Sequence, residues 1–97
     1  MADLFVVAVL CAREGQENQL RADLTAIVEP SRRDEGNLQY DLFADRGDKR
    51  RFVLVERWAD RTAHRKHDEQ GPQIAHFRKH GAGAVEKADV FFLDMIA

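Results

Sequence analysis

Six segments with regular hydrophobic spacing follow one another along the 97 residues, and few folds accommodate their order. Apolar residues at every second position, or a short run rich in valine, indicate a strand, whereas apolar residues three or four positions apart indicate a helix. By these criteria the chain runs strand, helix, strand, strand, helix, strand. The predicted segments are Leu4–Cys11, Gln16–Arg33, Leu38–Phe43, Arg51–Trp58, a helical region from Asp60 to about His80 with a break at Gly71-Pro72, and Val90–Ile96.

Polar residues and proline mark where several segments begin and end. Arg46-Gly47-Asp48 supplies a turn that makes the second and third strands an antiparallel hairpin. Pro30 is expected to kink the first helix or to end it early. The carboxylate of Asp60 can cap the second helical region. The charged residues of Arg32–Glu35 and Arg46–Arg51 are predicted to be solvated surface.

The order of the segments is the split pattern of a ferredoxin-like α+β domain, βαββαβ, in which a four-stranded antiparallel sheet carries helices on one face. Its strands place apolar residues on both sides of the sheet, more than one layer of helices can cover. An uncovered apolar face favours a homodimer in which two sheets pack together. The residues concerned are Phe5, Val7, Val9, Val53, Val55, Phe91, Phe92 and Leu93.

Length, charge and cysteine content restrict the class of protein. The chain has room for one domain, residues 1–97, which buries only about two-thirds of its unfolded surface. Its 17 acidic and 15 basic residues are mixed along the chain, so no basic stripe is available for nucleic acid. The apolar run Leu4–Ala12 is too short to cross a membrane, which takes about 20 residues. Cys11 is the single cysteine and cannot form an internal disulfide, so we expect a cytoplasmic protein.

Resemblance to a known family is carried by three segments, Glu35–Asp41, Phe52–Asp60 and Ala63–His67. Together they resemble the antibiotic biosynthesis monooxygenase family, including its small quinol monooxygenases, and the resemblance covers nearly the whole chain. It implies a dimeric α+β barrel of two ferredoxin-like domains, with a pocket in each subunit between sheet and helices. Some members oxygenate phenols or quinols with molecular oxygen and no cofactor. Others isomerise a small sugar-like signal compound, degrade haem or have no assigned activity, so the resemblance predicts fold better than reaction.

The chain departs from the family pattern after His67. Members often continue through three residues to Pro-His-Phe, whereas here the loop is one residue longer and Gln73 replaces the second histidine. A role that needs two histidines at this point would lack the second one. His76, one turn further on, is the residue that could take its place.

His67 is the predicted catalytic base. Cofactor-free oxygenation begins when a base removes a proton from a phenol or an activated carbon, which leaves an anion able to pass an electron to oxygen. Imidazole, with a pKa of about 6.5, suits this step at neutral pH. The alternative is a surface or capping histidine in a very polar helix.

Asn37 and Tyr40 are predicted to stabilise the anion that forms when His67 takes the proton. They lie three residues apart at the start of the second strand, where an amide and a phenol can donate hydrogen bonds. Asparagine after glycine is also ordinary turn chemistry, and tyrosine is common in half-buried strands. A purely structural role for each residue therefore stays open.

Four further residues are predicted to contact the substrate. Trp58 offers a face for stacking on an aromatic ring, unless it anchors the core or an interface. Glu56 shares a strand face with apolar neighbours, so its carboxyl must be paired or have a raised pKa, and it can orient His67 or pair with an arginine. Ile74 and Phe77 can close the pocket from the second helical region.

The four histidines lie between His64 and His80, at spacings that place pairs of them on one helix face. No carboxylate or cysteine signature completes a metal site and basic neighbours oppose a cation, so no metal is predicted. His76 is a conceivable axial haem ligand. The haem-degrading relatives, however, carry an asparagine on the first strand that Leu4–Leu10 lacks, so no cofactor is predicted.

The sequence therefore predicts a homodimeric monooxygenase that oxidises a small phenolic or quinol compound with molecular oxygen and no cofactor. An isomerase of a small carbonyl compound can use the same base and hydrogen-bond donors without oxygen. A non-catalytic small-molecule-binding or stress-response protein would keep the pocket without turnover. The substrate itself is beyond the sequence, because pocket shape depends on side-chain packing.

Overall fold

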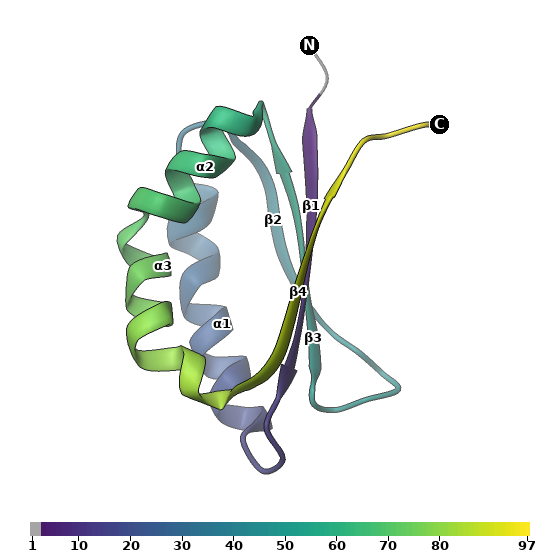
Figure 1. Ribbon diagram of the computed structural model, residues 1–97, viewed down its shortest axis with the longest axis vertical. Helices are drawn as coiled ribbons and strands as arrows, with labels where there is room; N and C mark the ends of the chain where they lie inside the picture. Colours follow the sequence, from purple (N-terminus) through teal and green to yellow (C-terminus); the bar gives the residue numbers. More distant parts are fainter. Residues whose placement is uncertain (1–2) are drawn as a thin grey trace.

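Four antiparallel strands and a layer of helices against one face of their sheet make up residues 3–97, the part of the chain that the computed structural model describes (Figure 1). Hydrogen bonding places the strands in the order β2-β3-β1-β4. This arrangement confirms the predicted ferredoxin-like βαββαβ fold. The strands are β1 (Leu4–Ala12), β2 (Asn37–Ala44), β3 (Arg51–Trp58) and β4 (Val85–Leu93), and the α-helices are α1 (Glu17–Arg32), α2 (Arg61–Gln70) and α3 (Pro72–His76).

The core lies between α1 and the helix-facing side of the sheet. The apolar residues of α1 at helical spacing are buried, as the sequence predicts, and β1 and β3 meet them with every second residue. Glu56 is one of these inward residues, so the predicted placement of a carboxyl among apolar neighbours is confirmed. The inward residues are Leu20, Leu24, Ile27 and Val28 from α1, Val6, Ala8, Leu10 and Ala12 from β1, and Phe52, Leu54, Glu56 and Trp58 from β3.

The second helical region is divided where the sequence predicts. Asp60 caps α2 by accepting a hydrogen bond from the backbone N–H of Ala63 at 2.8 Å, and Pro72 opens α3, where a missing N–H costs little. After α3 the chain forms a wider π-helical turn, Phe77–Gly81, which α-helical spacing does not reveal. None of the helices in residues 3–97 is long and apolar enough to cross a membrane.

Pro30 does not end α1 early, because the helix continues to Arg32. A proline two positions before the last residue of a helix removes one backbone hydrogen bond there and leaves most of the helix intact. The burial of Ser31, immediately after Pro30, shows that the last turn is packed against the rest of the protein.

The predicted position of the last strand, Val90–Ile96, is wrong. β4 begins five residues earlier and ends three residues earlier, because it pairs with β1 from Val85 opposite Ala12 to Leu93 opposite Phe5. Pairing with a neighbouring strand decides the limits of this edge strand, and its charged first half hides it from a search for apolar runs.

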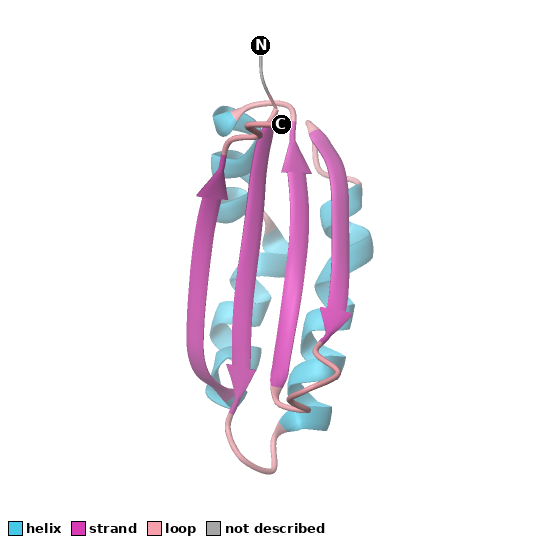
Figure 2. Cartoon of the chain, turned by 90° about the vertical axis from the view of Figure 1, so that its right-hand side faces the viewer, coloured by secondary structure: helices cyan, strands magenta, loops and turns pink. Residues whose placement is uncertain are grey.

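The sheet face opposite the helices is uncovered in the described chain, and Figure 2 shows its four strands with every helix behind them. Its apolar residues include Phe5, Val7, Val9, Val53, Val55, Phe91 and Leu93, which alternate with the buried positions. Phe92 instead lies on the helix side, opposite Val6. The structure confirms the uncovered face, while the dimer stays a prediction.

Candidate active site

An apolar cavity of about 400 Å³ lies between the sheet and the helices. Aliphatic and aromatic side chains from β1, β3, β4, α1 and α3 form most of its wall. A cavity of this volume and character suits a small organic molecule. The polar residues that line it are Tyr40, Glu56, His64, His67, Asp68 and Arg78.

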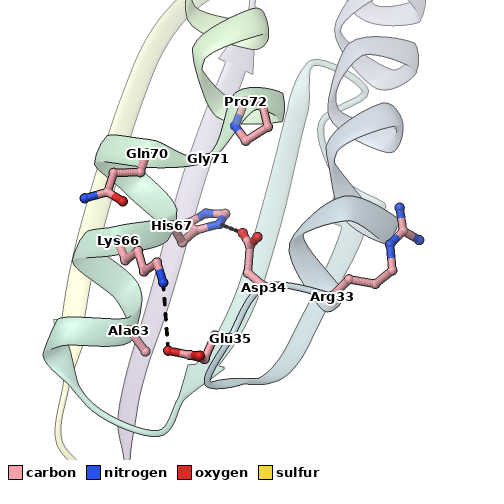
Figure 3. Close-up of a pocket in the computed structure, with 9 residues that line it drawn as sticks. All are labelled: Arg33, Asp34, Glu35, Ala63, Lys66, His67, Gln70, Gly71 and Pro72. Carbon is pink, nitrogen blue, oxygen red and sulfur yellow. Dashed lines mark hydrogen bonds and ion pairs between the residues drawn. The ribbon is translucent and has the colours of Figure 1, made fainter.

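His67 lies on the face of α2 that packs against the sheet, and its side chain is only 4% exposed. Its Nδ1 lies 2.7 Å from Oδ2 of Asp34, which follows the end of α1 (Figure 3). A neutral imidazole that donates its Nδ1–H to this carboxylate keeps the lone pair of Nε2 for a proton. In that tautomer the imidazole of His67 can act as a base.

Asp34 is held in turn by Gln73 of α3, whose Nε2 donates to Oδ2 at 2.9 Å and to Oγ of Ser31 at 3.2 Å. Three helices therefore converge on one carboxylate. Gln73, which stands where the family often has a second histidine, does not supply a second base here but positions the partner of the first.

The prediction that Asp34 is solvated surface is wrong. Its side chain is 27% exposed and bonded to His67, 33 residues away. Sequence spacing cannot reveal this pair because its members belong to separate elements. The nearest signal is the glycine two positions later.

Gly36 brings the segment that carries Asp34 close to α2. Its φ of +81° is left-handed, and a Cβ at this position would lie 2.5 Å from Cβ of Ala63. The carbonyl of Gly36 also accepts a hydrogen bond from the backbone N–H of Ala59 at 2.8 Å. Only glycine fits both the backbone conformation and the close approach.

Trp58 is completely buried behind the histidines and does not line the cavity. Its ring centroid lies 4.6 Å from that of His67 and 5.7 Å from that of His64. Its Nε1–H donates to Oε1 of Glu56 at 3.0 Å. Trp58 therefore contacts the base directly and packs beneath the polar end of the cavity.

Glu56 is a buried carboxyl in the wall of the cavity, 4% exposed. Burial raises its pKa to about 7, the hydrogen bond from Trp58 opposes the shift, and the negative charge of Asp68 adds to it. Within residues 3–97 no arginine or lysine forms an ion pair with Glu56, and it is Asp34 that holds His67. Of the two predicted fates of this carboxyl, the raised pKa is the one that the structure supports.

Tyr40 lines the cavity beside Glu56, to which it is paired across β2 and β3. Burial and the nearby charge of Glu56 raise the pKa of the Tyr40 phenol far above its ordinary value, so the hydroxyl stays protonated and able to donate. The amide of Asn37 instead donates to the carbonyl of Gln39 at 3.1 Å, and Asn37 does not line the cavity.

The structure thus brings five of the seven predicted site residues to one cavity and leaves Asn37 and Trp58 outside its lining. The five are His67, Tyr40, Glu56, Ile74 and Phe77.

His64 is a cavity residue to which the sequence assigns no role. Its ring lies 5.9 Å from that of His67 and 5.3 Å from that of Phe92. Burial, together with the nearby His67, lowers the pKa of His64, so its neutral form is favoured. The spacing of three residues on α2 was the available signal.

A second, more polar hollow of about 260 Å³ lies on the side of His67 where Asp34 is found (Figure 3). Lys66 and Glu35 form a 3.9 Å ion pair there. His67 belongs to the walls of both hollows. In the described part of the chain, no three histidine, cysteine or acidic side chains cluster closely enough to hold a metal ion.

Comparison with known proteins gives a consistent result. Residues 3–80 match the family described as antibiotic biosynthesis monooxygenase. The protein named "Putative monooxygenase YcnE" from Bacillus subtilis is 34% identical over 71 residues, which cover 73% of this chain and 70% of YcnE.

Solved structures are also similar to this chain. PA3566 from Pseudomonas aeruginosa is 30% identical with a TM-score of 0.94, and the match covers 100% of this chain and 97% of PA3566. SO0527 from Shewanella oneidensis is 26% identical with a TM-score of 0.90, over 97% of this chain and 91% of SO0527.

Proposed function

The chain belongs to the antibiotic biosynthesis monooxygenase family, and on this premise we propose that it is a cofactor-independent monooxygenase that oxidises a small phenolic or quinol compound with molecular oxygen. The family and the name of its relative YcnE support a monooxygenase-like function without specifying a substrate. The substrate class and the role of each residue are the parts that we propose.

The observation that carries the proposal is the Asp34–His67 pair in the wall of an apolar cavity. The hydrogen bond to Asp34 places the lone pair on Nε2 and stabilises the imidazolium that forms when His67 takes a proton. A phenol that loses its proton to Nε2 becomes electron-rich enough to reduce oxygen. Asp34 is a positioning residue in this scheme, because it acts through His67.

Tyr40 supplies a hydrogen bond to the phenolate oxygen that His67 creates. Tyr40 lines the same cavity, and the raised pKa of its phenol keeps the hydroxyl protonated at neutral pH. Beside the apolar wall of the cavity, such a donor stabilises negative charge more than it would in bulk water. Trp58 contributes by packing on His67, Ile74 and Phe77 complete the apolar wall, and Asn37 retains only a structural part in the proposal.

We also propose that two chains pack their uncovered sheet faces together as a homodimer. Phe91 and Leu93 are each about half exposed, and several valines surround them. An apolar face of this extent is uncommon on a monomer. Sedimentation equilibrium should give twice the chain mass, and a monomer at micromolar concentration would contradict the proposal.

The test is oxygen consumption by the metal-free protein with a panel of phenols, quinols and anthrones, measured beside His67→Ala. We expect the wild type to consume oxygen with at least one compound, and His67→Ala to lose at least about 100-fold in rate, because the base is gone. His76→Ala is the matched control, since His76 is exposed and does not line the cavity.

Each other outcome has a definite meaning. Turnover that survives in His67→Ala would remove His67 from the mechanism. Isomerisation of a carbonyl compound without oxygen uptake would identify an isomerase that uses the same base. Binding of panel compounds without any turnover would identify a non-catalytic small-molecule-binding protein.

A further inference from the structure

Glu56 is the one buried carboxyl of the cavity that the scheme above does not use. It is one of the inward-facing residues of β3, and it lies opposite Tyr40 of β2 in the wall of the cavity. Its hydrogen bond from Trp58 holds it in place, and Trp58 also packs on His67, so one indole links the carboxyl to the base.

The charged and titratable groups that face this end of the cavity come from several elements. Tyr40 of β2 is neutral, and His64 of α2 favours its neutral form. Asp68 of α2 is bound by Arg78 of the π-helical turn, whose guanidinium donates to Oδ1 at 2.6 Å and to the backbone carbonyl at 2.8 Å. The guanidinium of Arg78 is therefore already paired with another carboxylate, and within residues 3–97 no lysine or arginine forms an ion pair with Glu56.

Oxygenation of a phenol needs an acid as well as a base. When oxygen adds to a ring carbon, the outer oxygen of the new peroxide carries negative charge, which is costly in an apolar cavity. A protonated carboxyl within the cavity can neutralise that charge at once. Burial and the charge of Asp68 raise the pKa of Glu56 to about 7, which leaves a large protonated fraction at neutral pH.

We propose that Glu56 is a catalytic acid, which donates its proton to the outer oxygen of the peroxide formed on a substrate ring carbon that bears hydrogen. This inference rests on the monooxygenase function proposed above. It assigns opposite tasks to two residues of one cavity, since His67 accepts the first proton and Glu56 donates the second.

The steps balance for a phenol with hydrogen at the para carbon. Nε2 of His67 takes the hydroxyl proton, and the para carbon then forms a bond to one oxygen of O₂, which is reduced to a peroxide anion. Glu56 protonates its outer oxygen. The Glu56 carboxylate next takes the remaining proton from that carbon as the O–O bond breaks and a carbonyl forms. The departing hydroxide takes the proton from His67, so the products are a quinone and water, and both residues return to their starting states.

The protonation of Glu56 can be measured without any substrate. Trp58 is the single tryptophan of the chain, so its indole N–H gives one signal in a ¹H–¹⁵N spectrum, and that N–H donates to Glu56. We expect this signal to shift with a midpoint near pH 7, and the shift to vanish in Glu56→Gln, which keeps an oxygen acceptor. A midpoint below about pH 5, the range of an ordinary glutamate, would overturn the assignment of Glu56 as an acid at neutral pH.

The closing experiment separates the acid from the base by turnover. Without oxygen, Glu56→Gln should still form the phenolate of a bound substrate, seen as a shift of its absorbance to longer wavelength, whereas His67→Ala should not. With oxygen, Glu56→Gln should consume it about 100-fold more slowly than wild type, and should lose the fall in rate that wild type shows above about pH 7. Glu69→Gln, an exposed glutamate on α2, is the matched control.

Failure of this inference can be told apart from failure of the proposed function. Wild-type uptake with an unchanged rate and pH profile in Glu56→Gln would overturn the role of Glu56 alone. Absence of wild-type uptake with every compound would overturn the monooxygenase, and the peroxide role of Glu56 with it.

Discussion

Asp34 and Glu56 are two carboxyl groups of one site, and their surroundings differ. Asp34 is hydrogen-bonded to His67, whereas Glu56 lines the same cavity as His67. Asp34 lies in the polar hollow, partly open to solvent, and accepts hydrogen bonds from His67 and Gln73. Glu56 lies in the apolar cavity, buried, with one hydrogen bond from Trp58.

The contrast shows that environment, not residue type, divides the work of a site. A carboxylate that accepts a hydrogen bond from Nδ1 of a histidine can hold that imidazole in one tautomer. A carboxyl enclosed by apolar groups is stabilised in its protonated form. In the proposed mechanism, two acids of similar intrinsic strength take different roles in one site, a division that is common where an acid and a base must coexist at neutral pH.

Among these variants, Asp34→Asn should have the largest effect on turnover, because it replaces the carboxylate that is bonded to His67. An amide can donate to Nδ1 and so favour the wrong tautomer of His67, or accept without the stabilising charge. We expect turnover of any phenol or quinol that the wild type oxidises to fall by about 1,000-fold, with little change in substrate affinity because Asp34 does not line the apolar cavity. Steady-state kinetics of Asp34→Asn beside Glu35→Gln, an exposed neighbour, would show this, and equal rates for the two variants would mean that His67 needs no partner.

Gly36→Ala should disturb the same pair through the backbone. A left-handed φ and the 2.5 Å approach to Ala63 together should lower the free energy of unfolding by about 3 kcal/mol and also reduce turnover. Gly15 has a similar φ of +83° with no atom near its missing Cβ, so Gly15→Ala should cost only about 1 kcal/mol.

Urea unfolding of the two glycine variants separates strain from contact. Combining Gly36→Ala with Ala63→Gly should cost less than the sum of the single changes, because the second change removes the atom that the new Cβ meets. Full additivity would show that the close approach does not matter.

Glu56→Gln should reveal the raised pKa of Glu56 through the pH dependence of the free energy of unfolding. The pKa of Glu56 is raised from its ordinary value of 4.5 to about 7 in the folded protein, so below about pH 4.5 the group is protonated in both states. As pH rises from there to about 7, the unfolded chain loses the proton that the folded chain keeps. The free energy of unfolding therefore falls as the pH rises from about 4.5 to about 7. Above about pH 7 the contribution of Glu56 no longer changes with pH.

We expect the wild type to lose about 2 kcal/mol relative to Glu56→Gln between pH 5 and pH 8. Urea unfolding of both proteins at the two pH values cancels the contribution of groups that they share. A difference that does not change with pH would mean that Glu56 titrates alike in the folded and unfolded chain.

Most of the fold could be predicted from the sequence, because the spacing of apolar residues records which side of each element is buried. Leu20, Leu24 and Ile27 mark the buried side of α1, and the alternation from Phe52 to Trp58 marks that of β3. The limits of β4 could not be predicted in this way, because they follow from hydrogen bonds to β1.

Some residues of the candidate site could be predicted from the sequence, and others could not. His67, Tyr40 and Glu56 could be identified from their residue types and their places on elements that face the core. Asp34 could not, since it follows a run of charged residues and its partner lies on another helix. Trp58 was assigned to the substrate by its chemistry, whereas packing places it behind the histidines.

The sequence by itself determined the order of strands and helices, the buried side of most of them, and the residues with the chemistry to act as a base and as hydrogen-bond donors. These follow from local spacing and intrinsic side-chain properties. Only the tertiary structure decided which carboxyl is bonded to His67 and which has its pKa raised by burial, because both outcomes depend on the surroundings and hydrogen bonds created when separate elements meet. Asp34 and His67 are 33 positions apart in the sequence, and only the fold brings them together.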